Sequence, residues 1–88
     1  MRVAKLPVAA IPRARTTLET EGIWKAVVDR DTERILGVAL LGAEAGETLT
    51  TVQTAMLADL PYTALRDMII THPTMSEGLN LLFAALQD

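Results

Sequence analysis

Apolar and polar residues alternate along the first half of the chain in the way that β-strands require. Residues 23–29 (IWKAVVD) put their cleaner apolar set on one face, consisting of Trp24, Ala26 and Val28. Residues 34–41 (RILGVALL) form a nearly continuous apolar run, which predicts a central strand covered on both faces. The polar residues 30–33 (RDTE) between them suit the turn of an antiparallel hairpin.

Glycine and proline refine this sheet. Gly37 inside the second strand predicts a bulge or a close backbone approach. Residues 2–11 suit a further strand, but Pro7 and Pro12 cannot donate ladder hydrogen bonds, so that strand should lie at an edge. Residues 13–20 alternate too weakly to be assigned an element.

Helical spacing takes over in the second half. Residues 46–59 carry an apolar stripe at steps of three and four, made of Leu49, Val52, Met56 and Leu60. This helix should end near Leu60, because the residue before Pro61 is pushed out of the α region. Thr63 is then a suitable N-cap for a short helix that runs through Met68.

The last helix is expected to start at Thr74. Its buried side should consist of Met75, Leu79, Leu82, Phe83 and Leu86. Strands first and helices afterwards predict an α+β fold, an antiparallel sheet with helices packed on one face, in a single domain over residues 1–88.

Composition and charge narrow the possible functions. The chain has 88 residues, with 8 basic and 11 acidic side chains and a net charge of −3, so it lacks the basic excess of a nucleic-acid binder. Its apolar runs are too short for a membrane span. It has no cysteine, which excludes disulfides and thiol catalysis from this chain and fits a cytoplasmic protein.

Cofactor and metal motifs are missing as well. Gly37, Gly42 and Gly46 fit neither of the glycine patterns that hold a pyrophosphate or phosphate. With one histidine and no cysteine we expect no metal site. Glu44 and Glu47 are better explained by attraction to the positive end of a helix dipole.

The segment 71–77 (THPTMSE) has the strongest chemical signal, and it has two interpretations. In the structural one, Thr74 and Glu77 form a capping box at a helix start, and His72 is an ordinary turn residue. In the functional one, Glu77 reaches one ring nitrogen of His72 and fixes its tautomer for acid–base work. Glu77 cannot fully serve both roles, and the sequence leaves open the isomer of the bond to Pro73.

The same segment resembles the His-Pro-Thr-x-x-Glu signature of the flavoprotein disulfide reductases. Its surroundings are similar to that family too, through GIWKAVVDRDTERILGVALLGAEAGE and LPYTALRDMIITHPTMSE. The family includes glutathione reductase, dihydrolipoamide dehydrogenase and mercuric reductase. The resemblance covers residues 22–84 and identifies the chain as the C-terminal dimerisation domain of such an enzyme.

The resemblance implies a two-fold homodimer in which each histidine reaches the redox-active cysteine pair and the FAD of the other subunit. It assigns His72 as the acid–base group, Glu77 as the carboxylate that orients it, and the His72–Pro73 backbone as the part that faces the flavin. The enzyme would use FAD and NAD(P)H to reduce a disulfide or a metal ion. No nucleic-acid or membrane partner is expected.

The resemblance also implies that the FAD and NAD(P)H domains lie outside these residues. We therefore expect a fragment of a longer flavoenzyme that binds no cofactor and has no activity alone, and it stays open whether the family's first strand is missing. Arg13, Arg15 and the Leu-Pro-Tyr segment are more similar to metal- or oxidant-responsive members than to glutathione reductase.

Two other interpretations remain at this point. One is a standalone α+β interaction module in which His72 is structural. The other, an independent hydrolase using His72 and Glu77, is disfavoured because no serine or threonine is placed as a nucleophile and so small a fold offers little pocket volume.

Overall fold

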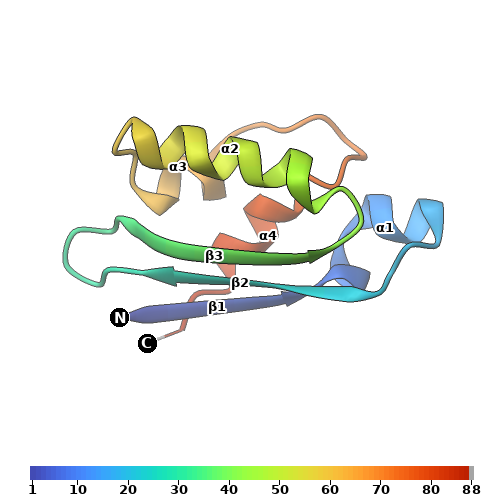
Figure 1. Cartoon of the computed structure of the whole chain (residues 1–88), viewed down its shortest axis with the longest axis horizontal. Coiled ribbons are helices and arrows are strands. Elements are labelled where there is room, and N and C mark those ends of the chain that lie inside the picture. The colour runs from blue at the N-terminus through green and yellow to red at the C-terminus, as the bar shows by residue number, and fades with distance from the viewer. Residues whose placement is uncertain (88) are drawn as a thin grey trace.

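The predicted hairpin is present and supplies two of the three strands of the sheet. In the computed structural model, which describes residues 1–87, β2 (Gly22–Val28) pairs antiparallel with β3 (Ile35–Gly42) across the polar turn. The other side of β2 pairs antiparallel with β1 (Arg2–Pro7). Helices cover one face of this sheet (Figure 1), so the fold is α+β, as predicted.

The strand order corrects one expectation. The order is β1-β2-β3, so β2 is central and β3 lies at an edge. On β3 the side chains of Leu36 and Leu41 are 49% and 68% exposed, respectively. A continuous apolar run predicts that both faces of a strand are buried, but it does not identify the elements or molecules that bury them. At these two positions β3 is therefore open to solvent and not covered on both faces.

Other features of the sheet follow the sequence. β1 lies at the opposite edge and ends at Pro7, which has no amide proton to continue the ladder. In β3 the register skips Leu36, so that Ile35 pairs with Val28 and Gly37 with Val27, which is a bulge beside the predicted glycine.

The unassigned stretch after β1 is helical. A short 3₁₀ turn (Val8–Ala10) leads into α1 (Pro12–Thr17). Proline suits this first helical position because its missing amide proton would have had no partner there. The chain therefore opens with a strand and a short helix before it reaches β2 (Figure 1), so the opening strand that the sequence left in question is present.

Of the three later helices, the first two begin and end close to the predicted positions, whereas the last begins four residues after the predicted Thr74. α2 spans Ala45–Leu57, α3 spans Tyr62–Asp67 and α4 spans Gly78–Ala84. Thr63 is not an N-cap, because α3 begins one residue earlier and Pro61 is its N-cap. Pro61 has the extended backbone that an N-cap position needs, and it has no side-chain hydrogen bond to the helix. It therefore occupies the cap position that the sequence assigned to Thr63.

The apolar stripe of α2 is only partly buried. The residues of α2 that are buried are Thr48, Val52 and Ala55. Met56 and Leu60, which the spacing placed on the buried side, are 38% and 43% exposed. The helix is therefore rotated relative to the predicted stripe, and part of its apolar surface faces outward.

The core lies between the sheet and α4. Trp24, Ala26 and Val28 are fully buried on the predicted face of β2. The predicted inner side of α4 is also confirmed, since Met75, Leu79, Leu82 and Phe83 are buried and Leu86 packs against them. Gly78 allows this close packing, because a Cβ there would lie 2.7 Å from the Trp24 ring.

No helix in residues 1–87 is long and apolar enough to cross a membrane.

Candidate functional site

The site lies on the connection between α3 and α4. Residues 68–77 run from the end of α3 along the outside of the domain and turn inward at Met75, whose side chain is buried (Figure 1). α4 begins at Gly78 and not at Thr74, because residues 74–77 form a separate turn first.

The competition for Glu77 is resolved in favour of the histidine. The Thr74 hydroxyl accepts a hydrogen bond from the Glu77 amide at 3.3 Å, which is one half of the predicted capping box. The other half is missing, because the Glu77 carboxylate contacts Nδ1 of His72 through both oxygens, at 2.8 and 2.9 Å. The Thr74 hydroxyl itself donates to the carbonyl of Thr71 at 2.7 Å, which closes the turn around the pair.

His72 is open to the outside while its partner is not. The side chain of His72 is 65% exposed, whereas that of Glu77 is 22% exposed. The peptide bond from His72 to Pro73 is cis, and Pro73 is also exposed. With Nδ1 held by a carboxylate, Nε2 is the ring atom left to meet a group from another molecule.

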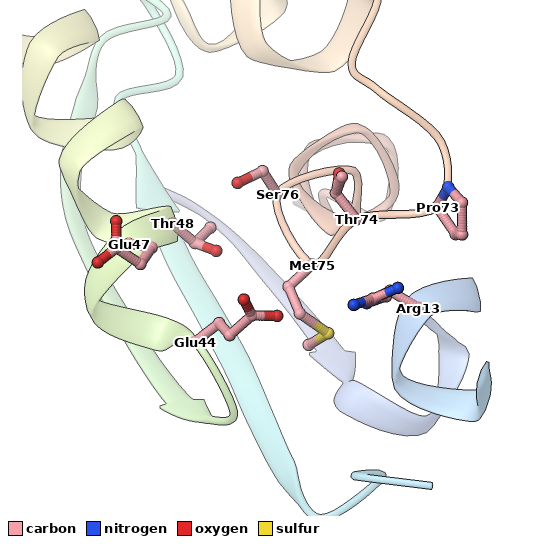
Figure 2. A pocket seen from close by; sticks show the side chains of 8 residues that line it. All are labelled: Arg13, Glu44, Glu47, Thr48, Pro73, Thr74, Met75 and Ser76. Atoms are coloured by element: carbon pink, nitrogen blue, oxygen red, sulfur yellow. The ribbon is translucent and has the colours of Figure 1, made fainter. Parts of the chain in front are cut away.

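A pocket adjoins the same turn (Figure 2). It is bounded by α1, by the start of α2 and by the turn itself, through Arg13, Glu44, Glu47, Thr48, Pro73, Thr74, Met75 and Ser76. Figure 2 shows the Arg13 guanidinium and the Glu44 carboxylate pointing into this space from opposite sides. Ser76 lines the pocket and forms no bond to His72, so the turn offers the histidine no nucleophile of its own.

The sequence did not reveal one further residue of this connection. Asn80, in the first turn of α4, donates from Nδ2 to the carbonyls of Leu65, Arg66 and Met68 at 2.9, 3.1 and 3.0 Å. The sequence could show only that an asparagine lies early in a helix. It could not show the bonding partners of Asn80, because they are 12 to 15 residues away along the chain.

Metal binding finds no support in the described part of the chain. Residues 1–87 bring together no group of three histidine, cysteine, aspartate or glutamate side chains that could hold an ion.

Comparisons with known proteins agree on what this arrangement is. The sequence profile of the pyridine nucleotide-disulphide oxidoreductase dimerisation domain matches residues 1–82. The chain is 51% identical over 87 residues to the probable pyridine nucleotide-disulfide oxidoreductase RclA of Escherichia coli K12. It is 33% identical over 81 residues to a mercuric reductase of Lysinibacillus sphaericus and 38% identical over 79 residues to a dihydrolipoyl dehydrogenase of Thermus scotoductus.

Solved structures give the same answer. The copper(II) complex of the HOCl-induced flavoprotein disulfide reductase RclA from E. coli superimposes with a TM-score of 0.91 at 54% identity, over 93% of this chain and 19% of that one. LpdA from Mycobacterium tuberculosis, at 18% identity, shares the fold with a TM-score of 0.83.

An oxidoreductase dimerisation domain is thus the class that the fold and the matches define. The chain belongs to the pyridine nucleotide-disulphide oxidoreductase family. It covers 99% of its own length in the match to RclA but only 20% of that protein, and 15% of the mercuric reductase.

Proposed function

We propose that this domain supplies the acid–base group of an FAD-dependent, NAD(P)H-linked oxidoreductase that reduces a disulfide or a metal ion. In this proposal His72 acts at the redox-active cysteine pair of a second subunit, and Glu77 orients it. The observation that carries the proposal is the bond between the Glu77 carboxylate and an imidazole that is 65% exposed. The carboxylate holds one ring nitrogen and leaves the other exposed, which is the arrangement that an acid–base histidine needs.

The chemistry asks little of this chain. A thiolate attacks a disulfide sulfur, a new S–S bond forms, the old one breaks, and the leaving thiolate takes up a proton. His72 as an imidazolium can stabilise the attacking thiolate and give the leaving sulfur its proton. One histidine per chain is enough if the cysteines come from the partner, so a domain without cysteine can complete such a site.

The cofactors are assigned to the longer protein. FAD, when bound, accepts electrons from NAD(P)H and passes them to the cysteine pair. His72 and Pro73 fit a position beside a flavin, since both residues are exposed and their backbone can be approached from outside the domain. This domain itself is proposed to hold neither cofactor, and we place the protein in the cytoplasm.

Dimerisation requires a surface, and α2 and α3 offer one. An open groove between them is lined by Thr50, Thr51, Thr54, Ala55, Leu60, Ala64, Leu65 and Met68. The hydroxyls of Thr50 and Thr54 donate to helix carbonyls four residues earlier, so these threonines are satisfied within their helix. A second groove shares Leu60 and adds Leu36 and Met56.

We propose that a second copy of the chain covers these two grooves, which we call the α2–α3 face. We include Ile69 in the proposed interface, because it directly follows Met68 and is 99% exposed. Ile69 precedes His72 by three residues on the same connection, so in this proposal the interface continues along the connection toward the imidazole.

The electron acceptor is proposed at the level of its chemistry. The mercuric reductase and the copper(II) complex among the matches are named for metal ions, and the dihydrolipoyl dehydrogenase is named for a dithiol, which is the reduced form of a disulfide. A thiolate can bind such a metal ion or attack such a disulfide. An acid–base histidine near a cysteine pair serves both.

The test is the variant His72→Gln in the full-length protein, studied by stopped-flow absorbance. We expect NAD(P)H to reduce the flavin at the wild-type rate. Reoxidation by the acceptor should slow by about 10²–10⁴-fold, the usual contribution of a positioned acid or base. Equal reoxidation rates in the two proteins would refute the catalytic role and favour a structural histidine.

A further inference from the structure

We infer that Asn80 is a positioning residue for His72, an inference that rests on the proposed function. Its side chain holds the start of the connection between α3 and α4, and we infer that this contact fixes the position of the imidazole. Asn80 touches no reacting group itself.

The end of α3 creates the need for such a residue. The last carbonyls of a helix have no amide partner within that helix. α3 has neither a glycine nor an asparagine just after its last residue, Asp67, to provide the usual left-handed cap. The Nδ2 amide of Asn80 supplies donors instead, to Leu65 and Arg66 at the end of α3 and to Met68 at the start of the connection.

Asn80 joins both ends of the connection. Its side chain holds Met68, the first residue of the connection, while its backbone amide donates to the carbonyl of Glu77, the last one, at 3.1 Å. Glu77 in turn holds His72. The side chain of Asn80 therefore holds the end of α3 and the start of the connection, while its backbone amide holds the residue that contacts the histidine.

The two halves of the connection are anchored differently. Residues 74–77 are fixed independently of the Asn80 side chain, because Met75 is buried in the core and Thr74 bonds to Thr71 and to Glu77. Residues 68–70 have less support, since Ile69 is 99% exposed and Ile70 is only partly buried. Without the Asn80 side chain we expect residues 68–70 to move while the turn at 74–77 stays in place, which shifts His72 relative to Glu77.

The experiment uses Asn80→Ala in the full-length protein, with Gln53→Ala as the matched control. Gln53 is an exposed amide residue of α2, so its substitution also removes a side-chain amide from a helix. Asn80→Asp provides a second variant that keeps the shape of the side chain but places an acceptor against the same three carbonyls, and unfolding in urea shows that each variant is folded before its rates are compared.

Two readouts separate positioning from general stability. The methyl order parameter of Ile70, measured by NMR, should fall in both Asn80 variants. Reoxidation of the reduced enzyme should slow at least tenfold, because small misplacements of a catalytic group carry large costs in rate. Flavin reduction by NAD(P)H should stay at the wild-type rate, as it should for Gln53→Ala.

The outcomes are distinguishable. If the order of Ile70 or the reoxidation rate is unchanged in the Asn80 variants while His72→Gln slows reoxidation, the positioning role is wrong and the proposed function stands. If neither the Asn80 variants nor His72→Gln slow reoxidation, the proposed function fails and this inference fails with it.

Discussion

The carboxylate of Glu77 contacts Nδ1 of His72 with both of its oxygens, at 2.8 and 2.9 Å, five positions away along the chain. The same carboxylate could have satisfied the backbone amide of Thr74, as the capping box requires. The exposed imidazole is therefore held by a largely shielded carboxylate, and the turn is left with half of its cap.

This pairing leads to a prediction for Glu77→Gln. The amide keeps the size of the side chain and an acceptor oxygen, but it loses the charge that strengthens the bond. A hydrogen bond to a charged group contributes about 1.5–3 kcal/mol, so the reoxidation step should slow by about 10- to 100-fold. Stopped-flow measurement on the full-length protein checks this. Glu19→Gln, at an exposed glutamate after α1, should change nothing, and an unimpaired Glu77→Gln would contradict the orienting role.

The exposed α2–α3 face predicts the effect of a charge at its tip. Ile69→Lys adds a cation where the side chain is 99% exposed, so the folded subunit should tolerate it. Burying that cation against a second copy is costly unless it is paired. We expect a raised dimer dissociation constant in analytical ultracentrifugation.

The control for this prediction is Leu41→Lys, at a leucine of β3 that is 68% exposed. It should leave the dissociation constant unchanged. If Leu41→Lys dissociates the dimer and Ile69→Lys does not, then the interface lies on the sheet and not on the α2–α3 face.

Gly78 predicts a local conflict between helix propensity and packing. Alanine favours a helix over glycine by up to about 1 kcal/mol. At position 78, however, a Cβ would lie 2.6 Å from Ile11 Cδ1 and 2.7 Å from Trp24 Cζ3. Overpacking of this kind costs about 1–3 kcal/mol, so Gly78→Ala should lower the free energy of unfolding measured in urea.

Gly46→Ala is the matched control for that measurement. Gly46 lies in α2, and a Cβ there would meet nothing within 4 Å. This variant should be as stable as the wild type or slightly more so. Equal effects at the two positions would show that the contact with Trp24 is not what requires glycine.

The β2–β3 turn predicts a dependence of stability on pH. Oδ1 of Asp29 accepts hydrogen bonds from the amides of Thr32 and Asp31, both at 2.9 Å, which lower the pKa of Asp29 below its ordinary 3.8. Its contribution to stability is therefore present above pH 3.8 and is lost as the pH falls through the lower value in the folded state.

Asp29→Asn should remove this dependence. The variant should be less stable than the wild type at pH 7, and the difference should shrink below pH 3.8, as urea unfolding at pH 7 and pH 3 would show. Asp31→Asn should leave the profile as it is. A constant difference between wild type and Asp29→Asn across this range would contradict the assignment.

Local patterns determined much of this protein from the sequence alone. The period-two alternation around Trp24 placed the correct face of β2 in the core, because side chains of a strand alternate whatever the strand pairs with. Pro7 marked an edge strand and Gly37 a bulge for equally local reasons. The segment around His72 and Glu77 identified the family, because its residue types and their spacing can be recognised in the sequence without any knowledge of the fold.

Choices between competing partners were decided only by the tertiary structure. The apolar run of β3 could not say whether strands or another molecule would cover it, and α2 could not say which part of a wide stripe would meet the core. Glu77 had two possible partners, and packing of Met75 and the course of the connection brought it to His72. Asn80 binds carbonyls far away in sequence, so its role exists only once α3 and α4 lie side by side. Periodicity determines the secondary structure that a segment favours and which side chains share a face. The contacts of that face depend on which other elements the rest of the chain places beside it.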